Sequence, residues 1–451
     1  MSIDNVLDGS LVAAVDAVAA CGLAAADLVE AGLARIGADA AAKACFNSLE
    51  AERARKSARK IDALSTEAKL DLPLCGALIA RKDLFSLAGR SATFSTHPQF
   101  HRTGTEDAPV LRQLYEAGAI DLGAMHMSEF AMGPAGWNPH AGFLENPIDA
   151  ARVTGGSSSG SAAAVARRLV FGAVGTDTGG SIRIPSAYCG VVGLKPTQGA
   201  VSGRGVFPVS QTLDTAGPIA RSVADCALLF DMMAVPTAPL APGSGQKLRF
   251  AVLNRESLPV PPDDDVWDAF CGLIAQLRGK GHHVAEVGLP MMADLNVMSA
   301  IVFLSEAAAN HLPHLTGHLD LIGPQVAERL LQGLAFPAPL YLRAMQLRSR
   351  YLDQFTALAL ADSDVLLLPA TACAAPLRAT YDTLPDTGAV LDFNSRIGAY
   401  SAAFNYLGVP ALALPAKTAA EASTIGVQIV GSPYSDRVVL QAAAIVEACR
   451  G

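Results

Sequence analysis

The sequence predicts an α/β protein with a large mixed, mostly parallel β-sheet covered by helices on both faces. Three observations favour this class. Hydrophobic residues make up 51% of the 451 residues and charged residues only 17%, which provides enough apolar surface for a large core. Short apolar runs typical of buried strands recur along the chain. Helical stretches separate these runs, which is the order expected of consecutive β–α–β units.

The N-terminal part is expected to be helical. Residues 10–65 carry an Ala/Leu periodicity that is broken near three glycines, so residues 1–65 are expected to form helices that pack on the body. The basic run at 51–64 (AERARKSARKIDAL) fits an exposed helix. Residues 66–451 are then expected to form one continuous domain.

The body begins with an apolar run at 75–85, followed by a helical stretch at 108–117 and a second apolar run at 119–125. This spacing predicts a strand, a crossover helix and another strand. The Pro/Gly-rich stretch 236–245 is the best linker candidate, although the strands on its two sides can belong to one sheet. Further strands are expected at 171–175, 248–253, 365–369, 411–414 and 425–430.

The charge and the start of the chain exclude two classes of partner. With 34 Lys and Arg against 42 Asp and Glu, the net charge is −8, so the chain offers no positive field for a phosphate backbone. We expect no direct nucleic-acid partner. The start lacks the basic and apolar regions of a signal peptide, and no run of about 18 uncharged apolar residues occurs. These features predict a soluble, cytoplasmic protein with no membrane segment.

Metal and disulfide chemistry are not expected. The eight cysteines are scattered, have mostly apolar neighbours and include no CxxC pair, which indicates small core residues. His311, His314 and His318 have a spacing that suits one side of a helix. Pro313 interrupts that helix, however, and no carboxylate lies in step with the histidines, so we expect no metal site.

The first segment with chemical potential is a glycine- and serine-rich loop at 155–161 (GGSSSGS), followed at once by a helix-forming run at 162–168 (AAAVARR). Backbone N–H groups at a helix N-terminus suit an anion or a developing oxyanion. A flexible loop and a phosphate cradle are the alternatives. The lysine that ends a P-loop is missing, since Ala162 follows Ser161.

The second segment, 175–185 (GTDTGGSIRIP), follows a predicted strand and presents Ser181 after two glycines. Glycines allow a tight turn that aims several N–H groups at one point. Such a turn can place an oxyanion hole beside a nucleophilic serine, as in other serine hydrolases. Serine after two glycines is also found in ordinary turns.

A nucleophilic serine needs a base, and Lys82 is the best candidate. No histidine lies in a recognisable motif with an acid, and GxSxG is absent. In a strand, Lys82 shares a face with Leu78, Ala80 and Leu84. An apolar setting lowers the pKa of a lysine toward neutrality, as a lysine base requires. The alternative is a lysine whose stem packs while its ammonium reaches water.

Together these segments resemble the amidase signature family. The resemblance is carried by Lys82-Asp83, by the loop 155–161 and by residues 177–185 (DTGGSIRIP), with 24 residues separating Ser157 from Ser181. Weaker similarity extends over 72–233 and reaches the C-terminal strands. The resemblance implies the amidase signature fold for most of the chain.

The resemblance also implies a role for each matching residue. Ser181 would be the acyl nucleophile, Ser157 the bridging serine after a cis bond from Gly156, and Lys82 a base that starts neutral. No cofactor is needed, and the partner is a small-molecule amide. The backbone N–H groups of the oxyanion hole would come from Thr178, Gly179, Gly180 and Ser181. The residues that would hold the loops and the lysine in place are Ser158, Asp177 and Arg183.

Within the family, residues 122–149 are most similar to the A subunit of glutamyl-tRNA amidotransferases and to stand-alone relatives. Gly398 falls where glutaminases carry an acid for the substrate's amino group, whereas Arg348 matches their carboxylate-binding arginine. We therefore expect a stand-alone amidase for a small apolar amide, with Met132 and Trp137 lining its pocket. The alternatives are a glutaminase subunit that needs partner chains and a phosphate-binding module. We expect the chain to form a homodimer.

Overall fold

The computed structural model describes residues 2–235, 247–416 and 424–450. Each of the seven strands predicted from apolar runs is present, and so are several strands that the pattern did not indicate. The linker candidate 236–245 lies outside the described residues. The strands are β1 Phe46–Leu49, β2 Leu78–Lys82, β3 Ser91–Ala92, β4 Arg102–Thr103, β5 Ile120–Met125, β6 Gly172–Asp177, β7 Val192–Lys195, β8 Thr215–Ala220, β9 Arg249–Leu253, β10 His283–Val287, β11 Val365–Pro369, β12 Ala411–Pro415 and β13 Gly426–Val430.

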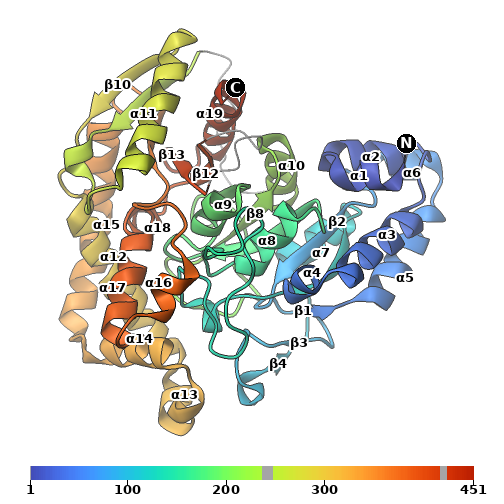
Figure 1. Ribbon diagram of the computed structural model, residues 1–451, viewed down its shortest axis with the longest axis horizontal. Helices are drawn as coiled ribbons and strands as arrows, with labels where there is room; N and C mark the ends of the chain where they lie inside the picture. The colour runs from blue at the N-terminus through green and yellow to red at the C-terminus, as the bar shows by residue number, and fades with distance from the viewer. Residues whose placement is uncertain (1, 236–246, 417–423, 451) are drawn as a thin grey trace.

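The strands form one large mixed sheet at the centre of the molecule (Figure 1). Among the described residues it has 11 strands in the order β1-β5-β2-β6-β8-β7-β12-β13-β11-β9-β10, and a separate sheet pairs β3 with β4. The predicted class, a large mixed sheet within an α/β fold, is confirmed.

The expectation that most strand pairs are parallel is wrong. Parallel pairs join β2 to β5 and β6, and β9 to β10 and β11, whereas the other pairs of the large sheet are antiparallel. Two of the antiparallel pairs come from β8, which inserts between β6 and β7, and two come from β13, which inserts between β12 and β11. Strand β8 was not predicted, because Gly217 and Pro218 interrupt its apolar pattern. Both residue types are uncommon inside strands.

Helices make up most of the remaining structure. The predicted helices at 108–117 and 162–168 correspond to α7 and α8. The α-helices are α1 Ile3–Asp8, α2 Leu11–Ala19, α3 Ala25–Ala38, α4 Ala40–Ala44, α5 Ala51–Asp62, α6 Thr66–Leu70, α7 Pro109–Glu116, α8 Ser159–Ala166, α9 Arg183–Cys189, α10 Val223–Met233, α11 Asp264–Gly279, α12 Met292–Asn310, α13 Leu312–Gly317, α14 Pro324–Ala335, α15 Ala338–Ala359, α16 Arg378–Asp382, α17 Thr387–Gly398, α18 Ala402–Leu407 and α19 Asp436–Cys449. Short 3₁₀ turns are η1 Pro98–Phe100, η2 Glu129–Ala131, η3 Arg255–Ser257 and η4 Leu319–Leu321.

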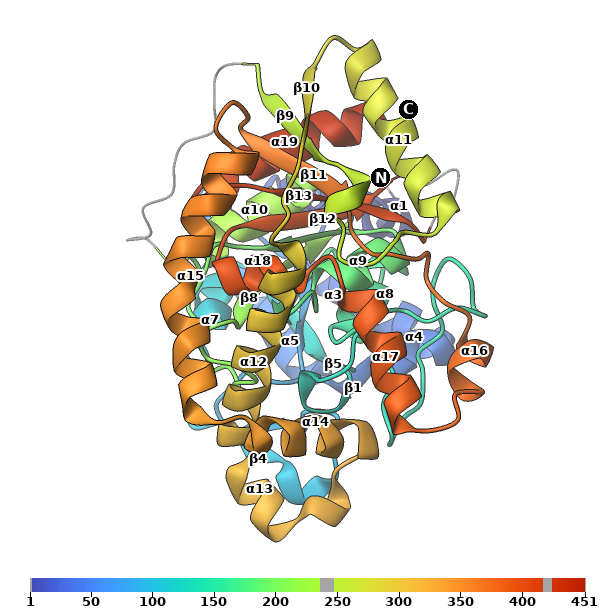
Figure 2. The ribbon, with the colours of Figure 1, turned by 90° about the vertical axis from the view of Figure 1, so that its left-hand side faces the viewer.

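Alternation of side chains along the strands explains why helices cover both faces. In β9, Phe250 and Val252 belong to the same core as Phe270 of α11. Ala251 and Leu253 point the other way, into the core that includes α12, α15 and α18. Successive residues of a strand face opposite sides of the sheet, so an uninterrupted apolar run needs cover on both. Figure 2 shows the α12, α15 and α18 layer in front of the sheet.

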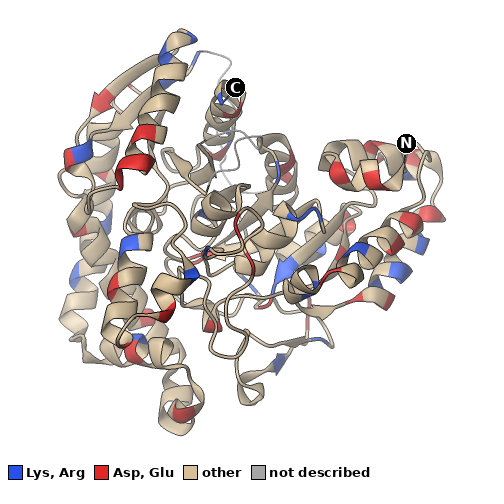
Figure 3. Ribbon diagram, viewed as in Figure 1, with Lys and Arg blue, Asp and Glu red and all other residues tan. Residues whose placement is uncertain are grey.

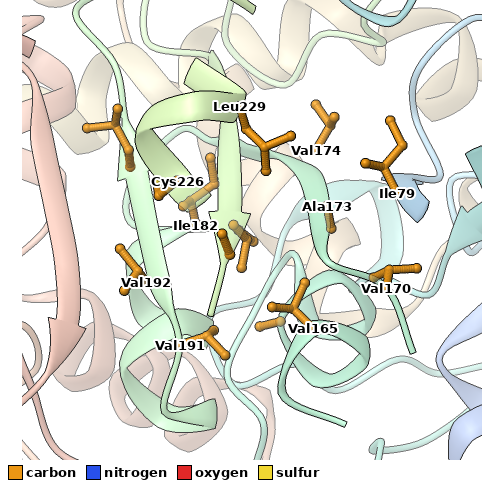
Figure 4. Packing of buried hydrophobic residues seen from close by; sticks show 14 of the residues in the cluster. Ile79, Val165, Val170, Ala173, Val174, Ile182, Val191, Val192, Cys226 and Leu229 are labelled. Carbon is orange, nitrogen blue, oxygen red and sulfur yellow. The ribbon is translucent and has the colours of Figure 1, made fainter. Parts of the chain in front are cut away.

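The middle of the sheet is packed by small and branched side chains. Figure 4 shows Leu229 and Cys226 of α10, and Val165 of α8, around the strand residues Ala173 and Val174. Gly172 lies directly under Leu229, since a Cβ there would meet the Leu229 Cδ1 atom at 2.3 Å. This close approach brings α10 onto β6.

The N-terminal segment 1–65 contains helices, as expected, and also a strand. β1 pairs antiparallel with β5 and forms one edge of the large sheet. The division of the chain into residues 1–65 and 66–451 stays a prediction. Charged residues lie mainly on peripheral helices such as α5 and α11 (Figure 3).

Helix α12 is long and apolar, although it contains Asp294 and Glu306. Among the described helices it is the one that is long and apolar enough to cross a membrane by length and composition, with a mean hydropathy of 1.3. In the structure it packs against α14, α15 and α18. Of its most apolar stretch, 39% is buried inside the protein.

Candidate active site

A cavity of about 680 Å³ opens beside the end of β6. Its wall includes the turn residues Thr178, Gly179 and Ser181, the loop 131–134, and residues of α12, α14, α17 and α18. Most of these helices lie toward the viewer in Figure 2. The cavity therefore connects the second glycine-rich segment with the C-terminal half of the chain.

Lys82, the last residue of β2, is completely buried beneath this region. Its Nζ donates hydrogen bonds to the Ser157 Oγ at 2.7 Å and to the Thr176 Oγ1 at 2.9 Å. Burial lowers the pKa of Lys82 to about 7, although the negative charges of Asp177 and Asp214 partly oppose this. The amine can thus be neutral near physiological pH, which is the state that a base needs.

Ser157 lies where the first glycine-rich segment meets α8, and its side chain is fully buried. The Gly156–Ser157 peptide bond is cis, as the resemblance implies. The next residue, Ser158, donates its N–H to the Ser181 carbonyl at 3.1 Å, which holds the two glycine-rich segments side by side. No side-chain hydrogen bond joins Ser157 to Ser181 among the described residues.

Three backbone N–H groups of the first glycine-rich loop are engaged within the fold. The N–H groups of Gly156, Ser158 and Gly160 all donate to backbone carbonyl groups elsewhere in the protein. Donors engaged in this way cannot also bind a phosphate. These three N–H groups are therefore unavailable to an anion, and the phosphate-cradle alternative gains no support from them.

Asp177 organises the second segment, in which Ser181 is partly exposed at the cavity wall. Its carboxylate accepts the N–H of Gly180 at 2.8 Å and that of Ile182 at 3.1 Å. It also pairs with the Arg183 guanidinium at 2.8 Å. Burial alone would raise the pKa of Asp177, but the Arg183 guanidinium outweighs it and holds the pKa well below its usual range. The turn is therefore built around a permanently charged carboxylate.

The turn leaves three N–H groups available. Among the described residues, the backbone N–H groups of Thr178, Gly179 and Ser181 donate to nothing, whereas that of Gly180 is held by Asp177. The structure thus differs from the four-donor expectation at Gly180. This residue has a φ of 124°, and a Cβ there would meet Ile184 and Ser401 side-chain atoms within 2.7 Å. Only glycine fits such a position.

Several contacts of the site were missed by sequence reasoning. The fully buried Arg183 guanidinium also binds the Gln428 side chain, the Asn405 side chain and the Ser401 carbonyl. The weaker similarity that reaches the C-terminal strands, among them β13, is the one signal that could have indicated Gln428. Nothing in the local pattern around Asn405 distinguishes it from a surface helix residue.

Asp214 is a second missed residue. It accepts a hydrogen bond from the Thr178 hydroxyl at 2.5 Å and further bonds from the N–H groups of Val209 and Ser210. Burial raises the pKa of Asp214 to about 6. This carboxylate fixes the Thr178 end of the turn from the opposite side to Asp177.

The two residues proposed for the substrate pocket have different surroundings. Met132 lines the cavity, but Trp137 is not among the described residues of its wall. The Trp137 ring lies 5.9 Å from that of Tyr381 and packs on a small core that includes Tyr188. In this structure Trp137 therefore packs outside the cavity wall, and its part in substrate binding stays a prediction.

We expect Trp137→Ala to change stability rather than specificity. Loss of a half-buried ring should lower the free energy of unfolding by about 1 to 3 kcal/mol, while kcat/KM for any good substrate changes by less than about threefold. Denaturant unfolding and steady-state kinetics on the same preparation check this. An altered preference among acyl groups without loss of stability would instead place Trp137 in the pocket.

The charged groups near the cavity also differ from expectation. Arg348 lies outside it and donates to the carbonyl groups of Thr212 and Asn405, so its proposed match to a carboxylate-binding arginine is not supported. Arg329 does line the cavity, with its guanidinium 4.7 Å from the centre of the Phe303 ring. No hydrogen bond or ion pair engages it among the described residues. Burial lowers the pKa of Arg329 to about 10, so it remains a cation at neutral pH.

Gly398 lines the same cavity. A Cβ added there would meet no atom within 4 Å, so an acidic side chain would have room but is absent. Within the part of the chain that the structure describes, no group of three or more His, Cys, Asp or Glu residues is placed to hold a metal ion. The groups present are a buried amine, two serines and free N–H donors, which suit acyl transfer.

Comparison with known proteins points in one direction. The family model described as Amidase matches residues 27–440. The chain is 32% identical over 452 residues to AtzE, from the 1-carboxybiuret hydrolase of Pseudomonas sp. (strain ADP), covering 96% of this chain and 97% of that protein. It is 31% identical over 479 residues to the A subunit of the glutamyl-tRNA(Gln) amidotransferase of Cupriavidus necator, covering 95% and 94%. A crystal structure of an amidase matches with a TM-score of 0.88 at 32% identity, covering 98% of this chain and 100% of that one.

Proposed function

The chain belongs to the amidase signature family, and from this premise we propose that it hydrolyses a small carboxylic amide to an acid and ammonia or an amine. In this proposal a serine acyl-enzyme forms on Ser181. The observation that carries it is the hydrogen bond between the buried Lys82 and Ser157, next to a turn whose Ser181 lines the cavity. A lowered lysine pKa beside a serine hydroxyl in a cleft is the arrangement expected of a catalytic base.

The steps follow from these groups. The Ser181 hydroxyl attacks the amide carbonyl carbon while its proton passes through the Ser157 hydroxyl to the neutral amine of Lys82. The free N–H groups of Thr178, Gly179 and Ser181 bind the oxyanion. The proton returns along the same path to the departing nitrogen, the C–N bond breaks, and an ester remains on Ser181. A water molecule then gives up a proton along the same path to Lys82 and attacks the ester carbonyl carbon. This step releases the acid and restores the Ser181 hydroxyl.

The remaining predicted residues would act by position. Asp177 and Arg183 hold the turn that carries Ser181, and Asp177 also keeps a negative charge near Lys82. Ser158 joins the two segments through its N–H bond to the Ser181 carbonyl and its hydroxyl bond to the Thr176 carbonyl. Their loss would misplace the nucleophile without removing a reacting group.

Assembly separates the main proposal from its alternative. The names of AtzE and of the amidotransferase relative both describe one subunit of a larger enzyme, and a glutaminase subunit would need partner chains here as well. A stand-alone amidase needs none. We expect the purified chain to be active without partner chains. We also expect it to be located in the cytoplasm and to form a homodimer, which light scattering coupled to gel filtration would detect. Activity that requires partner chains would favour the glutaminase subunit.

The empty position at Gly398 predicts discrimination against glutamine. Glutaramate, the monoamide of glutaric acid, has the same carbon chain as glutamine but lacks the α-ammonium. Because no acid at residue 398 meets that ammonium, we expect kcat/KM for glutaramate to exceed that for glutamine by at least about tenfold. Ammonia release by the purified chain measures both.

Gly398→Asp is the matched variant for this comparison, since a side chain at 398 meets no atom within 4 Å. The variant should narrow the difference between the two substrates. A wild-type preference for glutamine, above all one that needs partner chains, would support the amidotransferase interpretation instead.

Arg329 predicts a preference for amides with a distant carboxylate. A cation in a cavity wall without a protein partner is suited to an anionic substrate group. We therefore expect glutaramate, or a longer member of the same series, to be favoured over the neutral amide of equal length, pentanamide for glutaramate. Arg329→Met should reduce kcat/KM for the anionic amide by about 10- to 100-fold and leave the neutral amide within about threefold.

Arg343→Met is the control for Arg329→Met, because Arg343 is exposed on α15 outside the cavity. It should leave both substrates unaffected. Equal losses for the anionic and the neutral amide in Arg329→Met would show that Arg329 supports the fold rather than the substrate. That result would favour the substrate expected from the sequence, a small apolar amide without a carboxylate.

A further inference from the structure

A second group of reactive side chains lies at the contact between α2 and α6, far from the cavity. Cys21 follows the C-terminal end of α2, and its thiol is exposed. The Cys21 Sγ lies 3.5 Å from the Thr66 Oγ1 and 3.9 Å from the Ala19 carbonyl oxygen, and it accepts a hydrogen bond from the Lys69 Nζ at 3.7 Å. Figure 1 shows α2 and α6 at the opposite side of the molecule from α12 and α17.

Lys69 is the unusual member of this cluster. The residue is only 5% exposed, although its helix α6 is short and lies at the surface. The bond to the Cys21 sulfur is the one hydrogen bond of its ammonium among the described residues. A buried ammonium is costly unless an anion or acceptor faces it. The geometry therefore favours the ionised thiolate of Cys21 over the thiol.

The other charged and titratable groups around Cys21 are few. Asp62 opposes ionisation of the thiol, but its carboxylate is engaged by the N–H groups of Ala25 and Ala26 at the start of α3. The buried Cys75 is the remaining neighbour. The Thr66 hydroxyl and the Lys69 ammonium together hold the pKa of Cys21 below its ordinary value.

The remaining cysteines provide an internal comparison. Of the eight, only Cys21 and Cys271 are exposed. Cys271 lies on α11 without a lysine partner, and partial burial and the Asp268 carboxylate raise its pKa. Exposure alone therefore does not distinguish Cys21 from Cys271. The neighbouring Thr66 hydroxyl and Lys69 cation do, and thiolate content decides the reactivity of a cysteine.

We propose that Cys21, held as a thiolate by Lys69, is a modification site that hydrogen peroxide and other soft electrophiles attack before any other cysteine of this chain. With peroxide, the Cys21 sulfur attacks one oxygen and the O–O bond breaks. The sulfur is oxidised by two electrons to a sulfenic acid, and the departing hydroxide takes a proton from solvent to become water. The thiolate remains accessible because its sulfur lies at the surface.

Competitive labelling of the intact protein tests this inference. Isotope-coded iodoacetamide is applied between pH 6 and 9, and peptide mass spectrometry follows Cys21 and Cys271 in the same sample. We expect Cys21 to react at pH 7 at least about tenfold faster, with a midpoint below the value of about 8.5 found for free cysteine. Hydrogen peroxide followed by dimedone should then give an adduct on Cys21 but not on Cys271.

Two substitutions assign the effect to Lys69. Lys69→Met should slow Cys21 at pH 7 to within about threefold of Cys271, while Lys69→Arg should keep most of the difference because the cation is retained. Lys43→Met, which removes a lysine of α4, is the control and should change nothing. Circular dichroism establishes that each variant is folded.

Equal reaction rates at Cys21 and Cys271 in the wild-type protein would overturn the proposal, and so would a folded Lys69→Met variant that labels Cys21 as fast as the wild type. If Lys69→Met does not fold, the labelling rates of Cys21 and Cys271 in the wild-type protein and in Lys69→Arg still test the proposal. Because the cluster is remote from the cavity, labelling should leave amide hydrolysis unchanged. Failure of the hydrolase proposal would therefore not affect this test.

Discussion

Ser181→Ala is expected to abolish amide hydrolysis, with kcat reduced by more than about 10³-fold. The Ser181 hydroxyl lines the cavity wall and makes no hydrogen bond that the fold depends on among the described residues. The free energy of unfolding should therefore stay within about 1 kcal/mol of the wild-type value. Ammonia release from glutaramate, together with urea unfolding, measures both quantities.

Ser186→Ala is the matched control for this variant. Ser186 lies on α9, shortly after Ser181, and its buried hydroxyl has no hydrogen-bond partner among the described residues. Its removal should leave turnover intact. A covalent acyl adduct trapped by acid quench should map by mass spectrometry to the peptide containing Ser181 in the wild-type protein and in Ser186→Ala. Retention of more than a few per cent of activity in Ser181→Ala would place the nucleophile elsewhere.

Lys82→Met is expected to have the second-largest effect, a loss of about 10³-fold or more in the acylation rate. Methionine nearly fills the space of the lysine stem, so the variant isolates the amine from the packing. Removing the amine leaves the buried hydroxyl groups of Ser157 and Thr176 without this hydrogen-bond partner, so the free energy of unfolding should fall by about 1 to 3 kcal/mol. Single-turnover measurements with an activated amide would follow acylation directly.

Lys82→Arg is the companion to that variant and should not restore activity. A guanidinium stays protonated at every accessible pH, so it cannot accept the proton that leaves Ser181 through Ser157. An active Lys82→Arg enzyme would contradict a mechanism that depends on a neutral lysine.

The dependence of kcat/KM on pH follows from the titration of Lys82. Burial lowers the pKa of Lys82 to about 7, so the amine is protonated below that pH and cannot act as a base. We expect kcat/KM to rise with pH through a midpoint near 7 and then to level off. The buried His126, whose pKa burial lowers to about 4, titrates too low to account for this midpoint. A profile without an acid limb would require a different base.

Local sequence patterns were sufficient for the parts of the site that a single segment builds. The run at 75–85 predicted β2 and placed Lys82 in an apolar setting, and the structure buries it completely. The segment 175–185 predicted a tight turn at Ser181, and Gly180 has the positive φ that such a turn requires. These features depend on backbone preferences and on strand alternation, which neighbouring residues determine.

Long-range contacts were not accessible in the same way. Arg183 binds groups 218, 222 and 245 residues further along the chain, at Ser401, Asn405 and Gln428. Their identity depends on which strands become neighbours in the sheet. The antiparallel insertion of β8 changed that order, and its Gly217 and Pro218 hid it from a search for apolar runs.

By itself the sequence determined the α/β class, the seven apolar strands and the two glycine-rich segments with Lys82, because each is encoded in a short stretch with its own conformational preference. The tertiary structure decided which segments meet. It engaged several N–H groups of the 155–161 loop, left Trp137 out of the described cavity wall, and placed Arg329 rather than Arg348 in that wall. The physical reason is that packing, not local propensity, decides which face of a loop or helix is buried against distant parts of the chain.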